Sequence, residues 1–384
     1  MENILRLNNM SLLRDVGWLR QSLEVRASGL PKEWQGYCTW SLDECTRLHR
    51  AIERNLSDLS YGHAGLLPDI LSQTQALTRS FLQFSRQVTP VLRGSSVDQV
   101  ALRVLLWLHM SHHETRDVPV AVSNEDFSIW PIVPPTYFLP CSVEQSLLYL
   151  PLFFHEFGHL LYAVHHPEMD DLVKSLQEKV AELLTPMSRF DDAMAAQVMQ
   201  EQQLVVERWY EWMQELFCDA VGVTIGGGSF VQAFSTYLRM CGRDQFQVPK
   251  MDLELQSHPV TWLRIRMMAA RLRSRKCADL ADSLEMEWAA IAGIMGVTED
   301  YFGFFADDFL EPVMDTLSDM LTEAAPVGLD SPVTNASDVS EYINPIPILI
   351  EAWERFYKKP ESYEDWEKTA IECLLGNICH SPKP

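Results

Sequence analysis

Residues 152–162 read Leu-Phe-Phe-His155-Glu156-Phe-Gly-His159-Leu-Leu-Tyr, an apolar run that carries two histidines and a glutamate. In the buried helix that this run predicts, His155 and His159 lie on one face, about 6 Å apart along the axis. Two imidazoles at that spacing can bind one zinc ion, and Glu156 can accept a proton from a water that the ion acidifies. A core helix with two satisfied histidines is the alternative, but the complete His-Glu-x-x-His pattern favours a metal site.

The composition is that of an ordinary globular protein. The chain has 384 residues, of which 47% are hydrophobic and 22% charged, and its length allows one large domain or about two to three smaller ones. The formal net charge of −22 opposes binding to nucleic acid or to an anionic membrane, because both are themselves negative. We therefore expect no nucleic-acid partner and no membrane partner.

The cysteines and the N-terminal residues indicate the compartment. Eight cysteines are scattered along the chain without Cys-x-x-Cys spacing, which favours free thiols in a reducing environment. The first 25 residues mix Arg6, Arg14, Asp15 and Arg20 with leucines, an amphipathic pattern that does not match a signal peptide. No uncharged apolar run reaches the roughly 18 residues of a membrane span, so we expect a cytoplasmic protein.

The apolar pattern predicts a mainly α (α+β) protein in three regions. Residues 1–116 form an N-terminal helical region, residues 117–278 form the core, and residues 279–384 form a C-terminal helical region. Inside the core, the residues near 168–206 form a helical insertion that could act as a lid or a docking arm.

A small sheet is expected at the start of the core. β-branched and aromatic residues predict short strands near 118–122, 127–133 and 137–139. Because prolines interrupt this segment, we expect the strands at sheet edges, where one could hold an extended peptide by main-chain hydrogen bonds. A proline-rich loop is the alternative.

A catalytic zinc ion needs three protein ligands and one open position. We expect the third ligand to be Glu215, with Asp219 one helical turn later accepting a hydrogen bond from a ligand histidine. Their apolar neighbours indicate burial, and a buried acid requires a partner. His165 is a second candidate, but a straight helix carries it off the metal-binding face. Cys218 is expected to pack against its neighbours and not to bind the ion.

These motifs resemble a known family. His-Glu-x-x-His followed by a separate helix with Glu215-x-x-x-Asp219 resembles the gluzincin metallopeptidases, which have the thermolysin-like arrangement. The gap of 56 residues between His159 and Glu215 is more similar to that of CaaX prenyl proteases and heat-shock-type integral-membrane zinc peptidases, with their soluble relatives. Residues 257–265 read Ser-His258-Pro-Val-Thr-Trp-Leu-Arg264-Ile, which is similar to a third motif of that family.

The resemblance covers roughly residues 120–275 and implies a zincin-like catalytic core with a small β-sheet edge. It also implies that His258 stabilises an oxyanion and that Arg264 orients the site. Both side chains suit a developing negative charge, although a His-Pro pair also begins ordinary helices. The chain departs from the family in two ways. It lacks the family's membrane spans, so no prenylated substrate is implied, and Pro151 interrupts the expected helix.

Two further groups of charged or titratable residues have simpler interpretations. His109 and His113 also lie four apart, and a structural role at a helix end is favoured over a second metal site. Basic residues are frequent between Arg264 and Lys276, where a solvated helix face is the default and pairing with acidic helices is the alternative.

Together these features lead us to expect a zinc-dependent endopeptidase with a single zinc ion, which acts on a protein or peptide. His155, His159 and Glu215 would bind the ion, and Glu156 would be the general base. A regulatory protein partner could switch the activity. The alternatives are a non-catalytic interaction protein with a structural or regulatory zinc centre, and a zinc hydrolase of a non-peptide amide.

Overall fold

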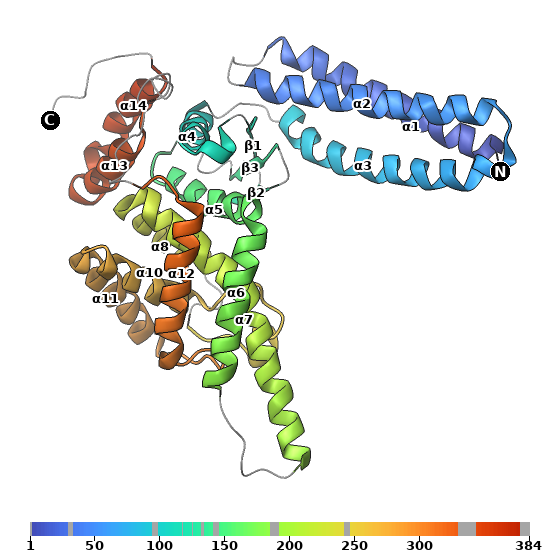
Figure 1. The fold of residues 1–384 in the computed structure, drawn as a ribbon. Helices are drawn as coiled ribbons and strands as arrows, with labels where there is room; N and C mark the ends of the chain where they lie inside the picture. Colours follow the sequence, from blue (N-terminus) through green and yellow to red (C-terminus); the bar gives the residue numbers. More distant parts are fainter. Residues whose placement is uncertain are drawn as a thin grey trace. The chain divides into compact units, whose positions relative to one another are not determined.

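The computed structural model describes residues 2–29, 34–93, 99–116, 118–124, 126–131, 134–140, 146–184, 192–241, 246–328 and 343–376 (Figure 1). Contacts divide the chain into two compact units. Unit 1 comprises residues 1–106 and 117–144, and unit 2 comprises residues 107–116 and 145–384. The described residues are mainly helical with a small sheet, which confirms the predicted mainly α (α+β) class.

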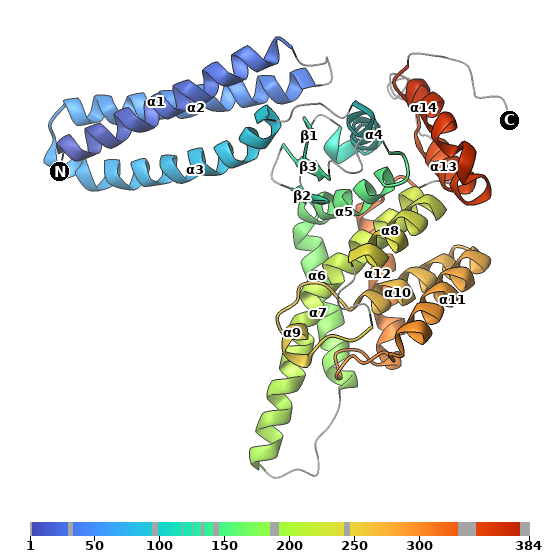
Figure 2. The same cartoon turned by 180° about the vertical axis from the view of Figure 1, so that it is seen from behind.

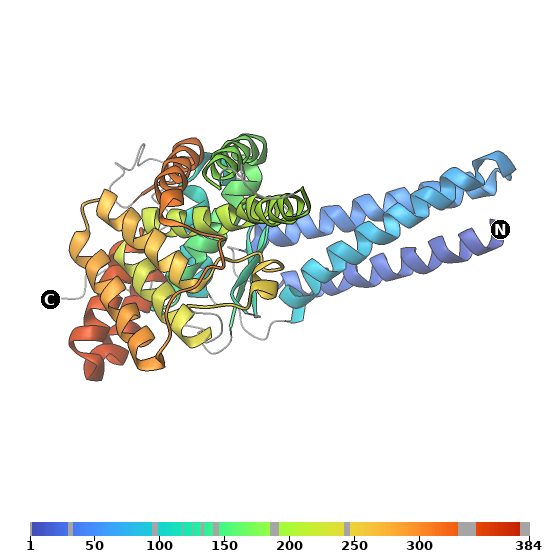
Figure 3. The same cartoon turned by 90° about the horizontal axis from the view of Figure 1, so that it is seen from below.

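Three long helices form most of unit 1: α1 (Glu2–Ala27), α2 (Gln35–Ser60) and α3 (Leu67–Arg93). They lie side by side in the views of Figures 1 and 3. Helix α1 buries residues at alternating steps of four and three, namely Leu5, Asn9, Leu12, Val16, Leu19 and Leu23. This spacing places a stripe on one helix face, so the core of the bundle follows from the sequence pattern. The polar member, Asn9, donates a hydrogen bond to Thr74 Oγ1 at 2.9 Å.

The sheet of unit 1 contains β1 (Ala121–Asn124), β2 (Ser128–Trp130) and β3 (Thr136–Leu139) in the order β1-β3-β2, as the view from behind also shows (Figure 2). Strand β3 pairs in parallel with β1 and antiparallel with β2. The expectation that prolines confine every strand to an edge was wrong for β3, which is central and fully buried. Its flanking prolines, Pro135 and Pro140, lie just outside the strand and remove no donor from the ladder.

Unit 2 holds the remaining described helices. They are α5 (Phe153–Val164), α6 (His166–Leu183), α7 (Asp192–Gly226), α8 (Gly228–Cys241), α9 (Lys250–Leu253), α10 (Thr261–Ser274), α11 (Ala278–Met295), α12 (Leu310–Ala324), α13 (Ile346–Lys358) and α14 (Tyr363–Leu374). Helix α4 (Gln99–Met110) begins in unit 1, and its last residues belong to unit 2. Short 3-10 helices are η2 (Ala64–Leu66), η3 (His113–Thr115), η5 (Leu150–Leu152), η6 (Asp307–Phe309) and η8 (Pro360–Ser362).

Helices α6 and α7 form a helical hairpin within unit 2, visible in Figures 1 and 2. Gln177 Nε2 of α6 donates to the carbonyl of Val206 at 2.7 Å, and Gln202 Nε2 of α7 donates to the carbonyl of Leu184 at 2.7 Å. The expected insertion near 168–206 corresponds to α6 and the first half of α7. The hairpin is therefore a regular packed element, and its role as a lid or docking arm stays a prediction.

The contacts give two units, whereas the sequence suggested three regions with boundaries at 116 and 278. Those boundaries stay a prediction. Among the described helices, none combines the length and the apolar composition that a membrane span requires.

Candidate metal centre

Helix α5 carries the two histidines of the motif. It begins at Phe153, directly after a 3-10 turn that contains Pro151, so the proline precedes the helix and does not kink it. His155 and His159 lie one turn apart with ring centroids 5.1 Å from each other. His155 is buried and His159 is partly exposed, so the pair lies at the edge of the core.

A close crossing of α5 and α7 brings the second half of the centre to these histidines. Gly158 faces Cys218 of α7, and a Cβ at Gly158 would lie only 2.7 Å from the Cα of Cys218. A side chain at position 158 would therefore push α5 and α7 apart, because no space is left for it between the two helices. The glycine between the two histidines therefore sets the distance from α5 to the carboxylates of α7.

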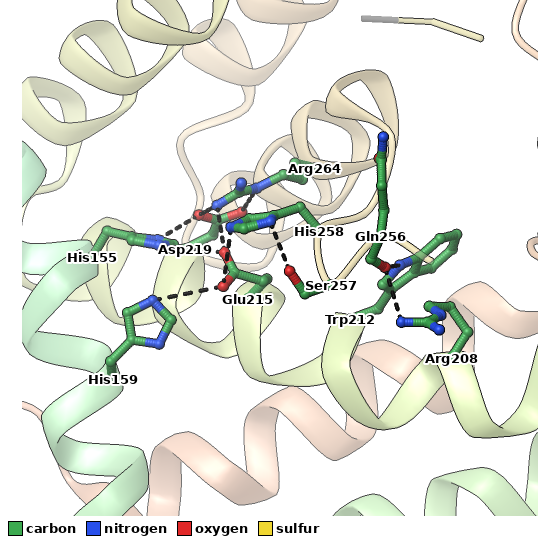
Figure 4. Close-up of polar contacts among 10 residues, drawn as sticks. All are labelled: His155, His159, Arg208, Trp212, Glu215, Asp219, Gln256, Ser257, His258 and Arg264. Carbon is green, nitrogen blue, oxygen red and sulfur yellow. Dashed lines mark hydrogen bonds and ion pairs between the residues drawn. The ribbon is translucent and has the colours of Figure 1, made fainter. Parts of the chain in front are cut away.

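Glu215 of α7 lies against both histidines, as Figure 4 shows. Its Oε2 is 3.5 Å from His155 Nε2, and its Oε1 is 3.6 Å from His159 Nε2. Ligands that surround one zinc ion at about 2.0–2.1 Å are separated from each other by about 3.3 Å. Oε2 of Glu215 is buried and makes no hydrogen bond of good geometry, although Arg264 Nη2 lies 3.3 Å from it. The donors fit a metal ion that prefers nitrogen and oxygen.

Asp219 connects His155 to Arg264. His155 Nδ1 lies 2.9 Å from Asp219 Oδ1, so Nδ1 carries a proton and donates it to this carboxylate. Arg264 of α10 donates to the same carboxylate from Nε and Nη2, both at 2.8 Å. The arginine is itself buried and lies 3.3 Å from Glu215 Oε2. Each buried charge in this group thus has an opposite charge beside it.

The carboxylates create a strong preference for positive charge between the imidazoles. Burial lowers the pKa of His155, but Asp219 and Glu215 outweigh burial and raise this pKa to about 10. Burial and the charge of His155 lower the pKa of His159 to about 4. Although burial alone would raise it, the pKa of Glu215 is held well below its usual range by His155 and Arg264. A cation bound between these side chains would meet a charge distribution that already favours it.

Glu156 lies beside this group and has a different environment. Burial raises its pKa to about 7. The charges of His155 and Arg264 lower this pKa, and the charge of Glu215 raises it. A carboxylate with a pKa near neutrality can both accept and return a proton at physiological pH. The expected general base therefore has a suitable proton affinity.

His258 approaches the centre from the segment before α10. Its Nε2 is 3.5 Å from Glu215 Oε1, and its Nδ1 is 3.0 Å from Ser257 Oγ. When the Ser257 hydroxyl donates to Nδ1, the proton of the neutral ring is on Nε2 and points toward the centre. The side chain of His258 is 59% exposed, whereas that of Glu215 is 9% exposed, so His258 lies on the solvent side.

Cys218 offers a competing donor. Donor atoms of His155, His159 and Cys218 all lie within 4.8 Å of one another, and this cluster can hold a metal ion. The thiol is fully buried, and burial followed by the neighbouring carboxylates raises its pKa well above the usual value. A cysteine binds metals as a thiolate, which this environment disfavours. Because Glu215 brings an ionised oxygen to within 3.5–3.6 Å of each histidine Nε2, we favour Glu215 as the third donor.

Phe234 of α8 was not anticipated from the sequence. Its ring stacks on that of His155 with centroids 5.4 Å apart, and the Arg264 guanidinium lies 4.7 Å from its centroid. Its aromatic side chain thus restricts the orientation of two site residues. No local motif marks Phe234, since a phenylalanine in an amphipathic helix is ordinary in a core.

Other candidates lie away from the centre. His165 follows the end of α5, and its Nδ1 lies 3.6 Å from Glu323 Oε1. His109 is buried while His113 is exposed, so this pair does not converge on one point. His109 packs edge-on against Phe157, which supports its predicted structural role.

The basic stretch of α10 is not a free solvated face. Arg264 pairs with Asp219, Arg266 with Asp307, and Arg273 with Asp282 and Glu285. The alternative of pairing with acidic residues of the same chain therefore describes these three arginines. The described cysteines, Cys38, Cys45, Cys218, Cys277 and Cys373, are free thiols, in line with the predicted absence of a disulfide framework among them.

Comparison with protein-family models, with curated proteins and with solved structures finds no match for this chain.

Proposed function

We propose that the chain is a zinc-dependent endopeptidase of the gluzincin kind. The observation that carries this proposal is the position of Glu215. From a helix 56 residues further along the chain, its carboxylate reaches within 3.5–3.6 Å of the Nε2 atoms of His155 and His159. A core helix with two histidines that are already hydrogen-bonded does not require a buried carboxylate between them, and burial of that carboxylate is costly unless a cation compensates it.

Zinc is the metal that best suits these donors. Two neutral imidazoles and one carboxylate are a known catalytic zinc set, and three protein ligands leave one position for solvent. Zinc bound there would supply an acidified water and a polarised carbonyl group. Asp219 supports this set, because its hydrogen bond fixes the His155 tautomer and strengthens Nε2 as a ligand.

Glu156 is the proposed general base. It would accept a proton from the attacking water and transfer that proton to the amine that leaves. Its pKa of about 7 suits both steps, because at neutral pH the carboxylate can bind the proton of the water and can also release it to the amine.

His258 and Arg264 have separate proposed roles. His258 Nε2 would donate a hydrogen bond to the negative charge that develops on the substrate carbonyl oxygen. Arg264 would not touch the substrate, because it is buried behind Asp219 and Glu215. It would hold both carboxylates in place and balance their charge.

The experiment that tests the proposal compares Glu156→Gln with wild type on unfolded protein substrates, with and without a chelator. We expect Glu156→Gln to keep its zinc and to lose cleavage by about 10²-fold or more, since the amide cannot accept the proton. Elemental analysis measures the zinc, and mass spectrometry of the products measures cleavage.

Glu168→Gln is the matched control, because Glu168 is an exposed glutamate in the first turn of α6. It should cleave like wild type. Equal cleavage by Glu156→Gln would rule out the assigned base. Zinc retention without any cleavage by wild type would favour a non-catalytic zinc centre, and hydrolysis confined to small amides would favour a non-peptide substrate.

A further inference from the structure

The segment between α9 and α10 carries His258 to the metal centre. This segment, residues 254–260, has no regular secondary structure. Its downstream end is held by the paired hydrogen bonds between Arg264 of α10 and Asp219 of α7. An irregular segment that is held at one end only would leave His258 free to move.

The upstream end is held by two other side chains of α7. Arg208 donates from Nη2 to the carbonyl of Glu254 at 2.5 Å and from Nη1 to the carbonyl of Gln256 at 3.1 Å. Trp212 Nε1 donates to the same Gln256 carbonyl at 3.3 Å. Figure 4 shows Arg208 and Trp212 converging on Gln256, two residues before His258. The guanidinium uses its planar fork to bind two backbone carbonyls that are two residues apart.

These two residues share one stripe of α7 with the metal centre. Arg208, Trp212, Glu215 and Asp219 are spaced by four, three and four residues. At about 100° per residue they lie within about 60° of each other around the helix axis. One rigid helix face therefore presents a metal donor and, at the same time, holds both ends of the segment that carries His258.

We infer that Arg208 and Trp212 are positioning residues that hold His258 over Glu215. The inference rests on the proposed function for its catalytic consequence, but the position of His258 can be measured without activity. Arg208 contacts the backbone of the segment and its own neighbour Glu211, and neither residue contacts the two histidine ligands in the described structure.

The first test measures the reactivity of His258 toward diethyl pyrocarbonate by mass spectrometry. The variants are Arg208→Met, which removes both hydrogen bonds, Arg208→Lys, which keeps the charge but not the fork, and Trp212→Phe, which removes the indole N–H and part of the buried ring system. We expect the modification rate of His258, relative to the exposed His63, to rise roughly fivefold in Arg208→Met. Smaller increases are expected in Arg208→Lys and Trp212→Phe.

Arg273→Met is the matched control, because Arg273 also makes several polar contacts but none with this segment. It should leave the His258 rate unchanged. The buried His155 reports on the fold in the same spectra and must stay unmodified. A His258 rate in Arg208→Met and Trp212→Phe equal to wild type would overturn the inference, whatever the activity.

The second test is a double-mutant cycle with His258→Ala on a peptide substrate. We expect Arg208→Met to lower kcat by about tenfold with little change in KM, because the contact acts in the transition state. In the His258→Ala background, the same change should lower kcat less than about twofold. Additive losses would show that Arg208 acts through something other than His258. Wild type without peptidase activity would reject the proposed function, while the modification rates would still decide the inference.

Discussion

Asp219 receives hydrogen bonds from two side chains that belong to different helices. His155 of α5 donates from Nδ1, and Arg264 of α10 donates from Nε and Nη2. A carboxylate with three charge-assisted donors is held in one orientation, and it transmits that orientation to the histidine ring. Although burial would raise it, the charge and hydrogen bonds of Arg264 keep the pKa of Asp219 below its usual value. The residue thus stays ionised and can accept all three hydrogen bonds.

The identity of the third donor gives a prediction about Glu215 and Cys218. We expect Glu215→Ala to weaken zinc binding by about 10²-fold or more, and Cys218→Ala to change it by less than about tenfold. The reason is that Glu215 brings a charged oxygen to both nitrogens, whereas Cys218 stays a protonated thiol. Competition with a chromophoric chelator measures both affinities. Zinc loss in Cys218→Ala with retention in Glu215→Ala would assign the ligand to the cysteine.

Two buried histidines of unit 2 are neutral for structural reasons. His112 Nε2 accepts a hydrogen bond from the N–H of Val327 at 2.9 Å, so its proton is on Nδ1, 2.7 Å from the Leu108 carbonyl. A second proton would destroy the bond from Val327. Burial lowers the pKa of His112, and burial lowers that of His109 to about 3.

Neutral His109 makes stability depend on pH. Its folded-state pKa of about 3 is below its unfolded value of about 6.5. Between these two values the unfolded chain binds a proton at His109 and the folded chain does not. Stability is therefore lost as the pH falls below about 6.5. Between pH 7.5 and pH 5.5 this residue should cost about 1.4 kcal/mol of unfolding free energy.

Denaturant unfolding of wild type and His109→Phe at both pH values measures the effect. Phenylalanine keeps an aromatic ring against Phe157 but cannot bind a proton, so the variant should lose about 1.4 kcal/mol less than wild type on acidification. The comparison cancels the titration of the metal centre, which both proteins share. An identical pH dependence would mean that the pKa of His109 is the same in the folded and the unfolded protein.

At the scale of elements, the crossing of α5 and α7 decides where the donors meet. Gly158 is necessary there because Cys218 occupies the space of a side chain. The long helix α7 then contributes Glu215 and Asp219 from one stripe, and α10 contributes Arg264 from the other side. The centre is thus built from three helices, with α8 adding the Phe234 ring.

Gly158→Ala should lower the thermal midpoint of unit 2 by roughly 5 °C. The added Cβ would meet the Cys218 Cα at 2.7 Å, and overpacking of this kind costs about 1–3 kcal/mol. Zinc affinity should fall in the same variant, because the helices must separate. Calorimetry and chelator competition measure the two effects.

Gly293→Ala in α11 is the matched control, because no heavy atom lies within 4 Å of the added Cβ. Alanine is the better helix former, so this variant should be as stable as wild type or more stable by about 0.5–1 kcal/mol. A Gly158→Ala protein with an unchanged midpoint and unchanged zinc affinity would contradict the role assigned to the crossing.

At the scale of the whole molecule, the candidate donors are confined to unit 2. Unit 1 has its own core of three helices and its own sheet. Binding of a metal stabilises only those parts whose opening would release the metal. A metal bound by the candidate donors would therefore not stabilise the helical bundle of unit 1 directly.

Chelator treatment should consequently act on unit 2 alone. We expect hydrogen exchange in peptides of α5 and α7 to accelerate by about 100-fold when zinc present at roughly 100 times its Kd is removed, and exchange in α1–α3 to stay the same. Mass spectrometry of the exchanged peptides measures both units in one sample. Equal acceleration in α1–α3 would mean that the two units open together.

Much of the fold follows from short-range patterns. The apolar periodicity of α1, α3 and α7 is a local property, because apolar residues spaced three or four apart lie on one face of any α-helix. The same holds for the spacing of His155 and His159 and for that of Glu215 and Asp219. The central position of β3 was not predictable in this way, because strand order depends on pairing with distant residues.

The sequence alone therefore specified the elements, the mainly helical class and the residue pairs that share a helix face. It could not specify the distance between those faces, the contact of Arg208 and Trp212 with the His258 segment, or the ring of Phe234 beside His155. Spacing within one helix depends on backbone geometry, which is the same in every protein. The approach of one helix to another depends on the side chains between them, and here on the space that Gly158 leaves for Cys218.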